Sequence, residues 1–135
     1  MNAETHLHQL LATMEPELQA GEFGFATVSP ADFRSLQVEP WGWFREAEGI
    51  TLILEQQAAS AAGLETAFSS RMITLTVHSS LEAVGFLAAI TEQLAAAGIS
   101  VNAISAYFHA HLFVPLDKAD QAMEVLRQIQ NEAGA

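Results

Sequence analysis

The segment from His78 to Gly85 reads HSSLEAVG and holds the polar residues with the most informative spacing in this 135-residue chain. Ser79 and Glu82 have the S-x-x-E spacing of a capping box, which satisfies backbone N–H groups at the start of a helix. Free N–H groups at such a turn also bind carboxylates. Gly85 costs on the order of 1 kcal/mol inside a helix, so its presence favours a close approach of backbone or ligand. The segment is interpreted either as a well-capped helix start or as a carboxylate site that also uses Ser80.

Asn102 is the polar residue of the next predicted strand that a ligand at this turn could reach. Alternation along a strand puts it on one face with Ser100, Ile104 and Ala106. An amide on a mostly apolar face can bind an ammonium group, and Glu82 could supply a carboxylate to the same group. The amide can equally satisfy a buried backbone group. Both interpretations stay open on the sequence.

His109 and His111 are separated by one residue, so in a strand both side chains point to one face. Two imidazoles without a third nearby ligand are weak evidence for a metal. We therefore predict no metal site and interpret both histidines, with Tyr107, as polar residues of a hairpin. The sequence has neither a G-x-S-x-G nucleophile motif nor a Walker or dinucleotide-binding glycine pattern. We predict no catalytic residue, no cofactor and no enzymatic activity.

The composition limits the classes of partner. Five Lys and Arg against sixteen Asp and Glu give a formal net charge of −11. A surface this negative repels phosphate groups, so we expect neither nucleic acid nor membranes as partners. The absence of Cys excludes disulfides and favours a cytoplasmic location. No signal-peptide pattern is present, and no apolar run approaches the roughly 20 residues that span a bilayer.

The hydrophobic pattern predicts a mixed α+β chain. We expect a helix near residues 7–14, with Thr5 as its cap, and further helices over 55–62, 81–97 and 117–129, the last capped by Asp117. Strands are predicted over 22–28, 50–54, 72–77, 99–106 and 111–114, with a turn at 107–110. Residues 67–70 are interpreted as a connector. Gly63 and Gly98 are predicted to end the helices before them.

The two halves of the chain have similar patterns. Strand 22–28 after Ala20-Gly21 parallels strand 99–106 after Ala97-Gly98, and strand 50–54 with its helix parallels strand 112–116 with the last helix. We therefore predict a degenerate N-terminal half over residues 1–66 and a second domain over residues 67–135. The second domain lacks the fourth strand of a βαββαβ unit. A strand from the first half, or from a second chain, is expected to complete its sheet.

Trp41, Trp43 and Phe44 form an aromatic group in a long predicted loop of the first half. Such a group can pack over the sheet, cover a ligand or close a dimer. Packing over the sheet is the more common outcome for aromatic side chains, and the other two interpretations stay open.

The segment from Val77 to Leu126 resembles the ACT domains, the small ligand-sensing modules of amino-acid metabolism. The similarity lies in the strand ending at Val77, in VGFL at 84–87, LAAAGI at 94–99, VNAIS at 101–105, HLFVP at 111–115, and in the helix bearing Ala119, Ala122 and Leu126. The whole chain is similar to stand-alone bacterial ACT proteins related to the aspartokinase regulatory region. In that group an N-terminal half with its own ACT-like elements precedes this segment.

The resemblance implies a ferredoxin-like βαββαβ fold, here two intertwined ACT-like units with antiparallel sheets and helices on one face. It also implies an amino-acid ligand at an interface between ACT units. Carried onto this sequence, the ligand site comprises His78, Ser79, Ser80, Glu82, Val84, Gly85, Phe86, Asn102, Ala103, Ile104 and Ser105. Many ACT domains carry Asp and Pro just before the glycine, where this chain has Ala83 and Val84.

Three hypotheses for the function follow. The leading one is a non-catalytic, amino-acid-binding regulatory protein that forms a homodimer or another oligomer. The alternative is an interaction module without a ligand, which pairs through sheet edges and the aromatic loop. A small metal-dependent enzyme that uses His109 and His111 is the least favoured.

Overall fold

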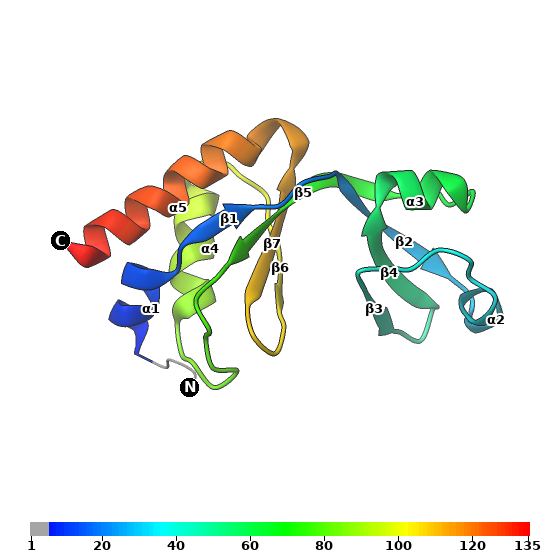
Figure 1. Ribbon diagram of the computed structural model, residues 1–135, viewed down its shortest axis with the longest axis horizontal. Coiled ribbons are helices and arrows are strands. Elements are labelled where there is room, and N and C mark those ends of the chain that lie inside the picture. The colour runs from blue at the N-terminus through cyan, green and yellow to red at the C-terminus, as the bar shows by residue number, and fades with distance from the viewer. Residues whose placement is uncertain (1–5) are drawn as a thin grey trace. The chain divides into compact units, whose positions relative to one another are not determined.

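A computed structural model describes residues 6–135 of the protein (Figure 1). The elements are α1 (Leu7–Thr13), β1 (Pro16–Leu18), β2 (Phe23–Val28), α2 (Pro30–Arg34), β3 (Gly42–Arg45), β4 (Ile50–Glu55), α3 (Gln56–Ala61), β5 (Ala67–Leu75), α4 (Phe86–Ala96), β6 (Asn102–Ser105), β7 (Ala110–Pro115), η1 (Leu116–Lys118) and α5 (Ala119–Gly134). The predicted cap Thr5 lies outside the described residues. The mixed α+β fold class is confirmed.

Residue contacts divide the chain into two units. Unit 1 contains the chain up to Ala20 and everything from Arg71 onward, and unit 2 contains residues 21–70. By these contacts, α1 and β1 belong with the C-terminal part of the chain. The predicted division between residues 66 and 67 stays a prediction about how the two halves of the sequence are organised.

Unit 2 is a complete βαββαβ unit, built from β2, α2, β3, β4, α3 and the beginning of β5. Its sheet has the order β3-β4-β2-β5, so the third and first strands lie in the middle, and every pair is antiparallel. Val28, Leu52 and Leu54 are buried with Ala59 of α3, which closes one face of the sheet.

Unit 1 repeats this layout with one strand taken from elsewhere in the chain. Its elements β5, α4, β6, β7 and α5 supply three strands, and the sheet order is β1-β5-β7-β6. The fourth strand is β1, with Pro16 opposite Leu75 and Leu18 opposite Ile73. The prediction that a strand from the first half completes this sheet is confirmed.

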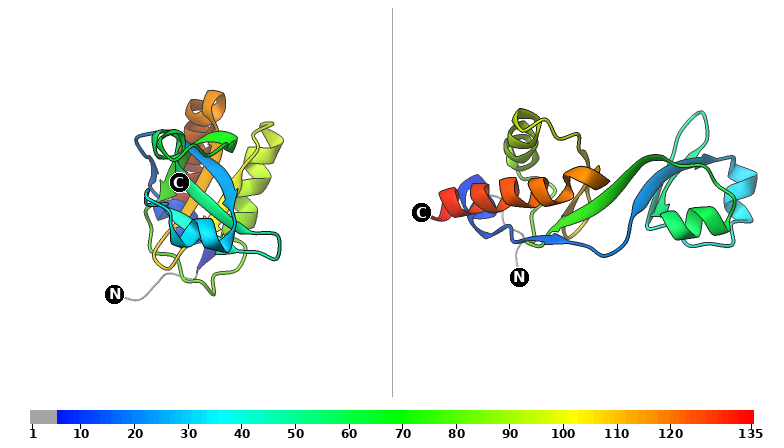
Figure 2. Two further views of the ribbon diagram at one scale, coloured as in Figure 1. Left: turned by 90° about the vertical axis from the view of Figure 1, so that its right-hand side faces the viewer. Right: turned by 90° about the horizontal axis from the view of Figure 1, so that it is seen from above.

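The core of unit 1 includes the N-terminal helix. Leu10 and Met14 are fully buried among side chains of β5, α4, β7 and α5, including Ile73, Ile90 and Leu126. Helix α1 lies alongside α5 (Figures 1 and 2). None of the helices within residues 6–135 has the length and hydrophobicity needed to cross a membrane.

Strand β5 contributes to the sheets of both units. Ala67 lies opposite Phe25 and Ser70 opposite Phe23, so one more residue is used on β5 than on β2. This is a β-bulge, and Phe68 adopts a left-handed φ of 58° within it. The prediction of a connector over residues 67–70 was wrong, because these residues form the fourth strand of unit 2.

Sequence reasoning also missed β1, α2 and β3. Because β3 was interpreted as loop, the predicted repeat matched β2 with β6. The strand orders instead match β2 with β5 and β3 with β6. The other predicted correspondence, of β4 and α3 with β7 and α5, agrees with the strand orders.

Two helix starts differ from the predictions. Helix α4 begins at Phe86 and not near Leu81, and α5 begins at Ala119 after the short 3-10 helix η1, without a side-chain cap from Asp117. The predicted end of α4 is confirmed. Gly98 has a φ of 75°, and the N–H of Ile99 donates to the carbonyl of Leu94 at 3.0 Å, which is a Schellman end.

The N-terminal segment is expected to stabilise unit 1 as part of its core. Met14→Ala removes a fully buried side chain and should lower the free energy of unfolding by about 2–5 kcal/mol. Urea denaturation of the full chain measures this change. Gln9→Ala, at an exposed position of α1, serves as the control and should change stability by less than about 0.5 kcal/mol. Equal effects of the two substitutions would contradict the assignment.

Candidate ligand-binding site

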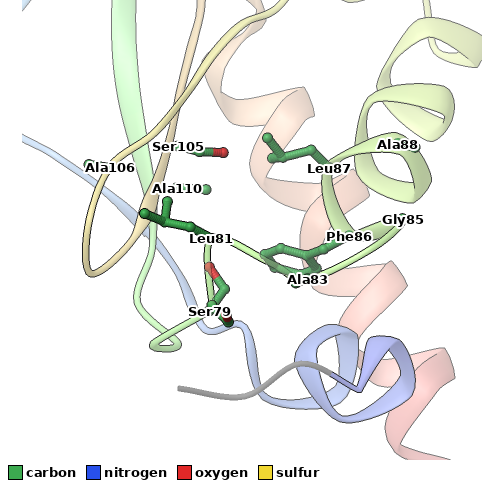
Figure 3. Close-up of a pocket in the computed structure, with 11 residues that line it drawn as sticks. Ser79, Leu81, Ala83, Gly85, Phe86, Leu87, Ala88, Ser105, Ala106 and Ala110 are labelled. Atoms are coloured by element: carbon green, nitrogen blue, oxygen red, sulfur yellow. The ribbon is translucent and has the colours of Figure 1, made fainter. Parts of the chain in front are cut away.

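A cavity of about 150 Å³ lies in unit 1 and is lined by three segments (Figure 3). The turn after β5 contributes Ser79, Ser80, Leu81, Ala83 and Gly85. The first turn of α4 contributes Phe86, Leu87 and Ala88, and the β6–β7 hairpin contributes Ser105, Ala106 and Ala110. In Figure 3 the Ser105 hydroxyl is directed toward Leu87 across the cavity.

The turn before α4 is held by its own backbone and by one hydroxyl. The Ser80 hydroxyl accepts a hydrogen bond from the Glu82 N–H at 3.0 Å, and the Ala83 N–H donates to the Ser80 carbonyl at 3.1 Å. Ser80 therefore stabilises a local turn of the kind that Ser and Asp commonly form. The predicted capping box of Ser79 and Glu82 was wrong, because the helix starts after both residues.

The N-terminus of α4 faces the cavity without a side-chain cap. Gly85 is the N-cap residue with a φ of 87°, and neither a capping side chain nor an acidic residue occupies the first turn. The first intrahelical bond runs from the Ala89 N–H to the Gly85 carbonyl at 2.9 Å. The N–H groups of the three preceding residues consequently have no partner inside the helix. These groups and the positive end of the helix dipole favour an anion.

The hairpin register decides which residues of β6 face the cavity. Ser105 lies opposite Ala110 and Ala103 lies opposite Leu112, so these residues share the face that packs on the helices. Asn102 lies one residue out of phase, opposite Phe113, and therefore points to the other face of the sheet. Its side chain is not part of the cavity lining.

The structure thus brings together five of the predicted site residues, namely Ser79, Ser80, Gly85, Phe86 and Ser105. The other six, His78, Glu82, Val84, Asn102, Ala103 and Ile104, do not line the cavity, and their role in binding stays a prediction. Sequence reasoning missed the apolar lining from Leu81, Ala83, Leu87, Ala88, Ala106 and Ala110. The strand alternation of Ala110 with Leu112 was a signal that could have placed Ala110 and Ser105 on the helix face.

The two histidines of the hairpin lie outside the cavity, with ring centroids 6.4 Å apart. The Nδ1 of His109 lies 3.2 Å from the Val77 carbonyl, which requires Nδ1 to carry the proton and donate it. The Nδ1 of His111 lies 2.9 Å from the Thr74 hydroxyl. Burial lowers the pKa of His111 below its usual 6.5, and the nearby positive charge of a protonated His109 lowers it further. Within residues 6–135, no three His, Asp or Glu side chains come together as a metal site would require.

The aromatic group of unit 2 is only partly covered. Trp41 packs edge-on against Phe23 at 5.3 Å between ring centroids, and Trp43 packs against Phe33 at 4.8 Å. The exposed fractions are nevertheless 59% for Trp41, 50% for Trp43 and 72% for Phe44. Trp43 and Phe44 belong to β3, which ends the strand order of the sheet of unit 2. The interpretation that the aromatic group packs over the sheet therefore accounts for only part of its surface. At least half of each of the three side chains is exposed to solvent.

The two βαββαβ units agree with comparisons to known proteins. ACT domain family models match residues 2–71 and residues 68–128, and the two ranges overlap on strand β5. The chain belongs to the ACT domain family. No protein of curated function matches the sequence.

Solved structures show the same fold over most of the chain. A Vibrio cholerae protein of unknown function, described as a "Possible Transport Protein", is 48% identical with a TM-score of 0.80, over 92% of this chain and 95% of that one. The regulatory subunit of aspartate kinase from Thermus flavus is 9% identical with a TM-score of 0.64, over 87% and 98% of the two chains. Aspartokinase III of E. coli, in complex with aspartate and ADP, is 11% identical with a TM-score of 0.62, over 84% of this chain and 32% of that one.

The lowered pKa of His111 predicts a loss of stability in mild acid. The unfolded chain takes up a proton near pH 6.5, whereas the folded protein takes it up only at lower pH. The stabilising contribution is therefore complete above pH 6.5 and declines as the pH falls toward the folded pKa. Melting temperatures between pH 7.5 and 5 should fall more steeply for the wild type than for His111→Gln. His8→Gln, at an exposed position of α1, is the control and should keep the wild-type slope; identical slopes for His111→Gln and wild type would refute the prediction.

Proposed function

We propose that this protein is a non-catalytic regulatory protein that binds an amino acid in the cavity of unit 1. One observation supports the proposal above the others: the uncapped N-terminus of an eleven-residue helix opens into a cavity lined by serine side chains. Its membership of the ACT family supports a regulatory role. The net charge of −11 supports the exclusion of nucleic acid and membranes as partners. The proposal includes a cytoplasmic location.

The cavity offers separate groups for the two ends of an amino acid. The backbone N–H groups of Phe86, Leu87 and Ala88, with the Ser79 hydroxyl, bind the carboxylate. Charge-assisted hydrogen bonds of this kind are about twice as strong as neutral ones. The Ser105 hydroxyl lies on the opposite wall, from the hairpin, and accepts a hydrogen bond from the ammonium group. Glu82 and Asn102 have no part in this arrangement because neither lines the cavity.

A ligand in this position would contact two segments at once, the start of α4 on one side and the β6–β7 hairpin on the other. The hairpin in turn contacts the segment after β5 through His109 and the Val77 carbonyl. Binding therefore favours the conformation in which turn, helix and hairpin are together, and it shifts the population toward that state. A partner, or a second copy of the chain, that contacts these segments would sense the change.

Isothermal titration calorimetry with the twenty amino acids tests the proposal. At least one should bind, and Ser79→Ala and Ser105→Ala should each weaken it by about 1 kcal/mol, or roughly fivefold. Ser100→Ala removes an exposed hydroxyl outside the cavity and should leave affinity unchanged. The proposal fails if no amino acid binds at millimolar concentration, or if all three variants bind as the wild type does.

A second candidate function is self-association through the aromatic group of unit 2. The exposed Trp43 and Phe44 on a strand at the end of its sheet favour it, since such edges pair readily with other strands and aromatic side chains are enriched at interfaces.

Sedimentation velocity over a range of concentrations distinguishes this candidate. The wild type should form a dimer, and Phe44→Ala and Trp43→Ala should shift the equilibrium toward the monomer by about tenfold or more in dissociation constant. Leu116→Ala, at an exposed position in unit 1, is the matched control. A monomeric wild type, or a dimer that all three variants leave intact, would exclude this surface.

A further inference from the structure

The lining of the cavity has a composition that bears on which amino acid it accepts. Its eleven residues comprise serines, alanines, leucines, one glycine and one phenylalanine, and none is ionisable. Phe86 is buried, and Leu81 and Leu87 approach from different segments (Figure 3). The polar atoms of the lining are hydroxyls and backbone groups. These groups can bind the α-carboxylate and the α-ammonium group that amino acids share. They offer no charged partner to the side chain of the ligand.

The volume sets a second limit. A cavity of about 150 Å³ is of the size that holds one benzene molecule in a protein interior. Glycine, alanine and serine are of this size. Lysine, arginine and the aromatic amino acids are much larger, so their side chains would extend through the open mouth of the cavity into solvent. They would gain few contacts with the lining beyond those that a small amino acid makes.

Charge adds to the effect of size. A charged ligand side chain that leaves water without a partner loses several kcal/mol of hydration. The net charge of −11 also disfavours the approach of aspartate and glutamate.

We infer that the cavity is selective for small amino acids with uncharged side chains, of the size of glycine, alanine or serine, and rejects acidic, basic and aromatic ones. This inference rests on the proposed function, because it specifies the ligand of the same site. Selectivity comes from the alanine residues that leave the space open and from the absence of a charged lining residue.

Direct binding measurements with amino acids of different size and charge test the selectivity. Calorimetric titrations with glycine, alanine, serine, aspartate, lysine and phenylalanine at one pH and ionic strength should show the first three binding about tenfold more tightly or better. If aspartate, lysine or phenylalanine binds as tightly as the best small amino acid, the inference is overturned while the proposed function stands. If no amino acid binds, both the inferred selectivity and the proposed function are overturned.

A substitution that fills the cavity tests its location. Ala106 lies in the hairpin turn and is exposed, so Ala106→Leu reduces the cavity without disturbing the core. It should weaken alanine and serine binding by about tenfold or more and affect glycine less. Ala95→Leu, at an exposed position near the other end of α4, is the control, and circular dichroism confirms folding of both. Unchanged binding to folded Ala106→Leu would overturn the assignment of this cavity.

Discussion

Strand β5 has to complete the backbone hydrogen bonding of two sheets, and this constraint decides where the other elements of both units belong. Its first residues pair with β2, and its last residues pair with β1. Ser70, at the end of the first part, is buried and donates its hydroxyl proton to the Phe23 carbonyl at 3.2 Å. Because an unpaired buried backbone group costs as much as a lost hydrogen bond, displacement of this strand would be unfavourable in both units.

The bulge in β5 allows one strand to serve both purposes. The additional residue and the left-handed Phe68 lie within the short pairing of β5 with β2, which runs from Ala67 to Ser70. The Phe68 ring packs edge-on against Phe25, with 6.2 Å between ring centroids, which offsets part of the conformational cost. Non-glycine residues rarely adopt positive φ, so the surrounding packing maintains this conformation. A β-bulge of this kind is a regular device for bending a strand.

The candidate site depends on the far end of the same strand. After β5 the chain forms the turn of Ser79 and Ser80, and Gly85 then allows the helix to start with its N–H groups uncapped. An L-residue in place of Gly85 would be strained at a φ of 87°. Short-range geometry at one glycine therefore determines whether the helix N-terminus is available to a ligand.

Long, periodic elements were predictable from the sequence, and short ones were not. The alternation of Ile73 and Leu75 identified the later part of β5, and Gly98 identified the end of α4, because burial and positive φ are reflected in the types of residue. Strand β1 has three residues, too few for a period, and it exists because β5 has a free edge. The S-x-x-E pattern misplaced the start of α4, because Ser80 bonds within a turn instead.

The candidate site was predictable in part for a similar reason. The serines and Gly85 carry a chemical signal in their residue types. The small residues that make the space, such as Ala83 and Ala106, carry none until the register of the hairpin is known. The register of the hairpin puts Asn102 on the face away from the cavity, which its residue type alone does not indicate.

The position of β1 in the chain has a consequence for synthesis on the ribosome. Unit 2 is contiguous, so all of its strands have been made once residue 70 leaves the exit tunnel. Unit 1 is interrupted by unit 2: α1 and β1 are made first, and the helix α5 that buries them is made last. Domains generally fold as units during translation, in the order in which they emerge. The apolar side chains of Leu10 and Met14 therefore stay without their packing partners until α5 has been translated.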